Sequence, residues 1–434
     1  MTPLAIGALG LAALFVLILA QVPIGVAMMI VGLAGFAMQT SWQPALTLLA
    51  TEPSGVLSNV DLATVPLFLL MGTFASAAGF SSDIYNAVAA LLGHRRGGLA
   101  YATIGGCAAF GAVCGSSTAT AATFAKAALP EMLKRGYSTA FSTGTIAAGG
   151  TLKALIPPSV VMILYCIAAK TFIFDLFLAA LIPALLAIAL NLIAIAVVVR
   201  LDPACAPVGP RVEWSERWRA LKTASPALVL MIAVFGGLYS GIFTVNEAAS
   251  VAAVLSLLFA LLRGRMSWPA LWQGMRESAS ATGMLYVILM GAFVFTYFIT
   301  LAKIPEALVA LIQGLAAPPL AIVFMLLVAY LILGAVFDEI SAMLITLPFV
   351  LPVILKLGYD PVWWGIINVV VIELGMIIPP IGVIVFILHG LAPDIPMRTI
   401  YRGVAPFIVA DLLLLALLAI FPSISLWLPR LLAG

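Results

Sequence analysis

The string GGTLKALIPPS, residues 149–159, decides how this chain is organised. Its two prolines, Pro157 and Pro158, cannot continue an α-helix, because proline lacks a backbone N–H and clashes with the preceding turn. A second string, VIELGMIIPPIG at residues 371–382, carries the same double proline 222 residues later. Both strings lie in long apolar stretches, so the sequence predicts two helices that are interrupted at matching places.

The composition is that of an integral membrane protein. Hydrophobic residues make up 64% of the 434 residues and charged ones 9%, whereas a soluble domain carries roughly 25% charged residues. The four cysteines are scattered and there are only two histidines, so neither a disulfide framework nor a metal site is indicated. The N-terminus lacks the basic region of a cleaved signal, and we interpret it as a retained first span.

The chain contains an internal repeat. The string LPEMLKRGYS from Leu129 matches LPVILKLGYD from Leu351, and 10 of the 30 positions aligned from there to the double prolines are identical. The identical positions include proline, glycine and tyrosine, so the match does not arise only from the abundance of leucine in apolar segments. The repeat predicts two units, residues 1–201 and 224–434, joined by a polar linker at residues 202–223.

Each half is predicted to cross the membrane five times and to hold one re-entrant hairpin. A spanning helix needs roughly 20 apolar residues, and Gly, Ser and Thr in the middle of an apolar stretch indicate a hairpin that turns back. Five crossings are an odd number, so the halves insert with opposite orientation. The fold class is therefore an all-α polytopic membrane protein with two inverted repeats. The spans lie near 4–20, 23–39, 62–80, 138–168, 172–200, 224–243, 246–262, 278–301, 361–388 and 403–428, and the hairpins at about 99–134 and 319–357.

The basic residues indicate the orientation. With the N-terminus outside, 14 Lys and Arg residues fall in the inner segments and 4 in the outer ones, and residues 41–60 carry none. Lys and Arg accumulate on the cytoplasmic side of membrane proteins. We therefore expect the N-terminus outside and the linker at residues 202–223 inside.

Inverted repeats with broken helices are typical of transporters. Free carbonyls at the end of a half-helix favour a cation, and free amides at its start favour an anion. The sequence therefore predicts one central site made of both hairpin tips and both breaks. Asp338 could equally be a helix cap, and Glu373 could have a partnered structural role.

Lys153 is the least expected residue at the first break. It could pair with a nearby acid, attract an anionic substrate, or replace one of the bound cations. The last possibility would lower the number of coupling ions.

Four long strings resemble the large membrane subunit of the tripartite ATP-independent periplasmic (TRAP) transporters: GSSTATAATFAKAALPEM, GTIAAGGTLKALIPPS, NEAA and GAVFDEISAMLITLPF. The resemblance covers essentially the whole chain. It implies an elevator-type importer of small organic acids such as C4-dicarboxylates, with Na⁺ as coupling ion and no other cofactor, in the bacterial inner membrane with a periplasmic N-terminus. It also implies a small four-helix membrane subunit, a periplasmic substrate-binding protein, a small anionic substrate and the lipid bilayer as partners, and no nucleic acid.

The resemblance also implies roles for individual residues. Ser116, Ser117, Gly150 and Thr151 are similar to one cation site, and Asp338, Gly375 and Pro379 to its mate. Candidate substrate contacts are Thr118, Lys153, Pro157 and Glu339. The family usually has Gly at the position of Lys153 and Thr at the position of Ile378, so this chain lacks one hydroxyl ligand at the second break.

Other functions have less support in the sequence. A stand-alone symporter of an anion and a cation, built on a related inverted-repeat scaffold, is the closest alternative. A membrane-embedded hydrolase would need a motif such as HExxH or GxSxG, and an ATP-driven permease would need a phosphate-binding loop; the sequence has none of these. The substrate stays open among dicarboxylates, keto acids, sugar acids and sulfonates, as does the number of sodium ions.

Overall fold

The chain is helical throughout the described residues, 2–314 and 317–433 of a computed structural model. The first half contains α1 (Pro3–Leu19), α2 (Ile24–Gln39), α3 (Trp42–Leu57), α4 (Thr64–Ala77), α5 (Phe80–Leu92), α6 (Gly98–Gly111), α7 (Ser117–Ala127), α8 (Leu129–Lys134), α9 (Thr139–Leu152), α10 (Val160–Ala169) and α11 (Ile173–Leu201).

The second half begins after the linker. It contains α12 (Trp214–Tyr239), α13 (Val245–Leu262), α14 (Trp268–Leu301), α15 (Ile304–Gly314), α16 (Pro319–Val336), α17 (Glu339–Lys356), α18 (Pro361–Gly375), α19 (Val383–Leu391), α20 (Met397–Ile420) and α21 (Ser423–Ala433). Three short 3₁₀ turns complete the described elements: η1 (Val60–Ala63), η2 (Lys153–Leu155) and η3 (Pro203–Cys205).

The helices are those of a multi-pass membrane protein. Eight of them are long and apolar enough to cross a bilayer, and a ninth span results if the bent pair Thr139–Leu155 and Val160–Ala169 is counted as one. The two segments of this pair meet at an angle of 40°, where Pro157 and Pro158 stop the helix. Helices α1 and α2 are apolar but shorter, with 17 and 16 residues.

The two halves repeat the same order of helices. A shift of 222 residues carries α6 onto α16, α7 onto α17, α9 onto α18, α10 onto α19 and α11 onto α20. The halves also complete one another. Helix α2 packs on α14 while α13, its repeat mate, packs on α4; α7 contacts α19 while α17 contacts α10. The expected all-α architecture with a hairpin and a broken helix in each half is confirmed.

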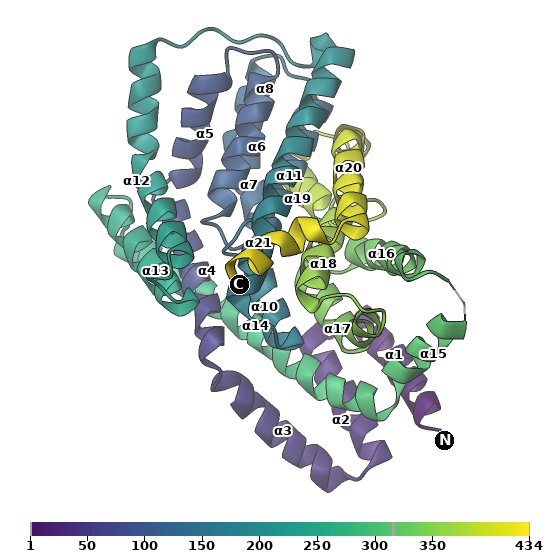
Figure 1. Ribbon diagram of the computed structural model, residues 1–434. Helices are drawn as coiled ribbons and strands as arrows, with labels where there is room; N and C mark the ends of the chain where they lie inside the picture. Colours follow the sequence, from purple (N-terminus) through teal and green to yellow (C-terminus); the bar gives the residue numbers. More distant parts are fainter. Residues whose placement is uncertain (1, 315–316, 434) are drawn as a thin grey trace.

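Figure 1 shows how these contacts arrange the molecule. Helices α4, α5, α12 and α13 lie together on the left, and α14 runs diagonally below them toward α1, α2 and α15. The hairpins and broken helices occupy the middle and the right, in front of and beside α11. One hydrophobic core joins both halves, and Trp363, Trp364 and Phe177 are fully buried within it.

Several helices differ from the predicted spans. Helix α12 starts at Trp214, within the predicted linker at residues 202–223, and α5 and α15 occupy segments where no span was expected. Helix α3 occupies the outer segment where no helix was expected, and Trp42, Leu46 and Leu57 on it are exposed. Helix α14 starts at Trp268 instead of residue 278, because the Ser267 side chain accepts a hydrogen bond from the Ala270 N–H and caps it. The last predicted span, 403–428, is divided between α20 and α21, because Pro422 cannot continue α20.

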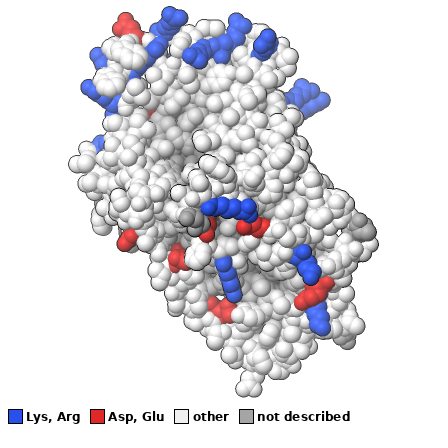
Figure 2. Space-filling view, in the orientation of Figure 1, with Lys and Arg blue, Asp and Glu red and all other residues white. Residues whose placement is uncertain are grey.

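Basic side chains gather at one end of the molecule. Figure 2 shows Lys and Arg along the upper edge, where the linker between α11 and α12 runs in Figure 1. Arg263 at the end of α13 forms an ion pair with the buried Asp83 of α5. This pair ties the first half to the second.

Candidate functional site

The tip of the first hairpin is a non-helical turn followed by a capped helix. The chain leaves α6 after Gly111 and starts α7 at Ser117. The Ser116 side chain accepts a hydrogen bond from the Ala119 N–H at 3.2 Å and lies 2.9 Å from the Thr118 hydroxyl oxygen. Ser116 and Thr118 are half-buried and Ser117 is fully buried. The tip therefore gathers hydroxyl groups at the start of α7.

The tip of the second hairpin is capped by an acid. The Asp338 carboxylate accepts hydrogen bonds from the Ile340 and Ser341 N–H groups at 3.2 and 3.1 Å and caps α17. A carboxylate at this place also interacts favourably with the helix dipole. The capping role that the sequence left open for Asp338 is thus present in the structure.

The two tips meet through a serine. The Ser117 hydroxyl donates a hydrogen bond of 2.7 Å to Oε1 of Glu373 and lies 3.4 Å from Oε2 of Glu339. These residues are 256 and 222 positions away in sequence. Three elements, α7, α17 and α18, are therefore joined at one polar point. Sequence reasoning placed Ser117 and Glu339 in the central site and left the role of Glu373 open between that site and a structural partnership; the signal for Glu373 was its acidic side chain at the mate of Thr151.

The first break packs against the first hairpin. A Cβ atom at Gly150 would lie 2.8 Å from the Cβ of Ala121, so glycine permits α9 to approach α7 closely. The Thr151 hydroxyl donates to the carbonyl of Ala148 at 2.8 Å, which leaves its lone pairs free to accept or to bind a cation. Pro157 and Pro158 are buried.

Lys153 is enclosed in the protein interior. Its exposed fraction is 0%, and its Nζ has no hydrogen-bond partner in the structure. A Cβ at Gly111 would lie 2.9 Å from the Cβ of Lys153, so the stem of the lysine lies directly against α6. In the second half Gly375, the mate of Lys153, contacts Gly334 of α16 in a similar way: a Cβ there would lie 2.6 Å from the Gly334 carbonyl carbon.

The second break is open where the first is closed. Pro379 and Pro380 are exposed. They line a hollow of about 660 Å³ together with Tyr401 and Arg402. The Tyr401 hydroxyl donates to the carbonyl oxygens of Pro380 and Ile381, at 3.2 and 2.6 Å. Pro379 thus lies at the edge of this hollow.

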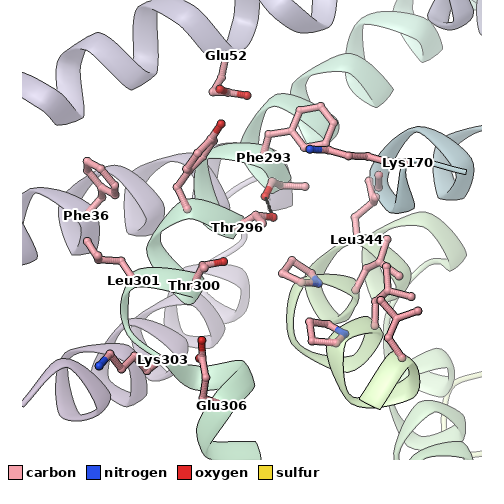
Figure 3. Close-up of a pocket in the computed structure, with 18 residues that line it drawn as sticks. Phe36, Glu52, Lys170, Phe293, Thr296, Thr300, Leu301, Lys303, Glu306 and Leu344 are labelled. Atoms are coloured by element: carbon pink, nitrogen blue, oxygen red, sulfur yellow. Dashed lines mark hydrogen bonds between the residues drawn. The ribbon is translucent and has the colours of Figure 1, made fainter. Parts of the chain in front are cut away.

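A larger cavity lies elsewhere. It has a volume of about 750 Å³ and separates α14 from α10 and α17. Figure 3 shows aromatic and aliphatic side chains around it, with Glu52, Lys170, Lys303 and Glu306 at its margins. None of the predicted site residues lines it. It is therefore a mostly apolar crevice between packed helices and not the candidate site.

The fold and the buried polar contacts define a class: membrane transport proteins built from two repeats with hairpins and broken helices. A family model described as "Tripartite ATP-independent periplasmic transporter, DctM component" matches residues 11–424. The chain belongs to this family. The prediction that it is no enzyme is confirmed by this membership.

Characterised relatives cover nearly the whole chain. The C4-dicarboxylate TRAP transporter large permease protein DctM of Pseudomonas aeruginosa is 34% identical over 89% of this chain and 92% of its own. The sialic acid TRAP transporter large permease protein SiaM of Vibrio cholerae is 30% identical over 96% and 97%. The isethionate TRAP transporter permease protein DctMQ of Oleidesulfovibrio alaskensis is 32% identical over 86% of this chain and 58% of its own.

A solved structure shares the fold. The YdaH transporter of Alcanivorax borkumensis superposes with a TM-score of 0.58 at 15% identity, over 89% of this chain and 90% of its own. This likeness concerns the architecture alone.

Proposed function

We propose that this chain is the large membrane subunit of a sodium-coupled importer of a small organic acid. The family membership supports the class, and the meeting of Ser117 with Glu339 and Glu373 is the observation that carries the site. A buried hydroxyl between two carboxylates offers oxygen ligands only, which suits a hard cation such as sodium. Ser116, Thr151 and the Asp338 cap supply further oxygens at the tips and at the first break.

The moving part comprises both hairpins and both broken helices, α6 to α10 and α16 to α19. The fixed scaffold comprises α1, α2, α12 and α13, with its N-terminus in the periplasm. Substrate and sodium cross together when the moving part slides against the scaffold, and the inward sodium gradient drives the cycle. The gathering of Lys and Arg at the linker end supports the orientation.

Two further proteins complete the system in this proposal: a small membrane subunit and a periplasmic substrate-binding protein that selects the acid. The names of the relatives range from C4-dicarboxylate and sialic acid to isethionate and ectoine. This variety of substrates among related permeases favours selection of the substrate by the binding protein. The acid carried by this system must therefore be identified by experiment. Thermal-shift screening of that binding protein against small acids would identify it.

Uptake into proteoliposomes tests the proposal. The chain is reconstituted with the small subunit and the binding protein, and acid uptake is followed with a sodium gradient or an equal potassium gradient. We expect uptake only with sodium and only with all three proteins. Sodium-independent uptake would remove the coupling, and uptake by this chain alone would favour the stand-alone symporter.

A further inference from the structure

A small, partly open cavity lies beside the serine–acid contact. Its volume is about 20 Å³, and it is lined by three polar residues: Thr151 from α9, Glu373 from α18 and Asp411 from α20. Apolar side chains close the rest, among them Leu155 and Leu414. All three polar residues are buried, with exposed fractions of 7%, 4% and 7%. The cavity is large enough for one water-sized occupant.

The oxygen atoms around this cavity have fewer hydrogen-bond donors than they can accept from. Oε1 of Glu373 accepts from Ser117, and Oε2 is buried without a partner. Oδ1 of Asp411 accepts from the Asn191 amide at 3.1 Å, and the same amide donates to the carbonyl of Ala187 at 3.0 Å, which fixes its direction. The Thr151 hydroxyl donates its hydrogen bond to the Ala148 carbonyl, so it has no proton left for the cavity. Acceptors converge here, and a buried acceptor without a donor is costly.

The buried charges do not balance. Among the described residues the buried charged side chains are Asp83, Lys153, Glu373 and Asp411. Asp83 has its partner in Arg263. With both acids ionised, Lys153, Glu373 and Asp411 sum to one negative charge, and Lys153 is not among the residues that line the cavity. An uncompensated charge inside the membrane is expensive, and one monovalent cation between the two acids would cancel it.

We infer that this cavity binds one sodium ion, with Glu373, Asp411 and Thr151 as ligands and Asn191 as the residue that positions Asp411. The inference rests on the proposed sodium coupling and places one of its ions beside the first break, where Thr151 is the residue shared with the expected cation site. Hard oxygen ligands and a small cavity suit sodium. The ion holds Glu373 in the position from which its other oxygen accepts from Ser117, so its binding orders the contact between the two tips.

Sodium-dependent thermal stability of the purified full-length protein tests the site. Unfolding temperature is measured against NaCl, with KCl keeping the ionic strength constant. For Asp411→Asn we expect the sodium concentration at half-stabilisation to rise about tenfold and the Hill slope to fall by about one, because the loss of a charged ligand weakens a cation site strongly. Asp394→Asn, an exposed acid before α20, serves as the matched control and should behave as the wild type.

A second, milder variant guards against misfolding of the first. Thr151→Val removes one neutral ligand and should raise the half-stabilising sodium concentration several-fold. Thr145→Val is its control, because Thr145 is buried on the same helix, bonds only to the Phe141 carbonyl and does not line the cavity. An unchanged sodium response in both Asp411→Asn and Thr151→Val overturns this site while sodium coupling stands. A wild type that sodium stabilises no more than potassium overturns both.

Discussion

The two double-proline breaks share a sequence pattern and differ in their surroundings. The first break is sealed: Lys153, Pro157 and Pro158 are buried between helices of both halves. The second is open: Pro379 and Pro380 border a hollow that also holds Tyr401 and Arg402. The same interruption of a helix therefore gives a closed interior at one end of the repeat and an accessible surface at the other. Under the proposed mechanism both breaks belong to the moving part, so we expect their accessibility to change during the cycle.

The strongest test of this difference places the glycine of the second double-proline site at the matching position of the first. Lys153→Gly puts at residue 153 the glycine that Gly375 supplies in the other half. It removes the buried ammonium, so another cation must then balance the buried acids Glu373 and Asp411. At low sodium we expect uptake to fall by more than about a hundredfold. At high sodium it should recover, with the Hill slope for sodium raised by about one.

Uptake against sodium concentration measures this effect. Lys126→Gly, which changes an exposed lysine of the first hairpin, is the control and should leave the slope unchanged. An unchanged slope for Lys153→Gly would count against the lysine as a substitute cation. A raised KM for the acid with an unchanged slope would instead support Lys153 as a substrate contact.

Cysteine labelling compares the openness of the two breaks directly. Ser159→Cys is placed at the sealed break and Ile381→Cys at its repeat mate; Ser159 is fully buried and Ile381 half-buried beside the hollow. A local opening that costs about 3 kcal/mol slows labelling by about a hundredfold. We therefore expect Ile381→Cys to react about a hundredfold faster with a water-soluble maleimide.

The four native cysteines are buried, so the unmodified chain supplies a low background for this measurement. Equal labelling rates at the two positions would contradict the sealed and open assignment. Saturating substrate with sodium should reduce the difference if the accessibility of the breaks changes during the cycle.

The hydrogen bond between Ser117 and Glu373, which joins the two halves at the candidate site, can be removed by deleting one oxygen atom. Ser117→Ala deletes the hydroxyl that donates to Glu373 at 2.7 Å. A hydrogen bond to a charged group contributes about 1.5–3 kcal/mol, so the unfolding temperature and the uptake rate should both fall. Ser142→Ala is the matched control, because Ser142 is buried on α9 and bonds only to the Ser138 carbonyl. Equal effects of the two variants would show that the Glu373 contact has no special weight.

The close helix contact behind the second break is the mildest test. Gly375→Ala places a Cβ 2.6 Å from the Gly334 carbonyl carbon, so α16 and α18 must separate. Overpacking of this kind costs about 1–3 kcal/mol, and the unfolding temperature should fall accordingly. Gly390→Ala on α19 meets nothing within 4 Å and should be neutral. An unchanged unfolding temperature for Gly375→Ala would mean that α16 and α18 can separate at little cost.

The architecture could be predicted from the sequence because local and repeated sequence patterns indicate it. Apolar length, the double prolines and the shared string from Leu129 and Leu351 indicated spans, breaks and repeat. It missed helix α3, because the segment 41–60 contains too many polar and proline residues for a span yet still forms a helix at the surface. It also extended the last span through Pro422, where the structure divides it.

The candidate site could be predicted only in part. Hydroxyl and acidic residues at the tips are visible in the sequence, so Ser117 and Glu339 were placed together. The partnership of Ser117 with Glu373, and that of Asp411 with Asn191, joins residues 256 and 220 positions apart. Asp411 lies within a predicted span, and no motif marks its cavity.

The sequence by itself determined that this is a membrane protein with an internal repeat and two interrupted helices, because the length of apolar segments and the effect of proline on a helix are local properties. Only the tertiary structure decided which polar groups share an interior point and which break is sealed. These properties depend on how helices from opposite halves pack, and a side chain acquires a partner or an unbalanced charge only when packing excludes water from it.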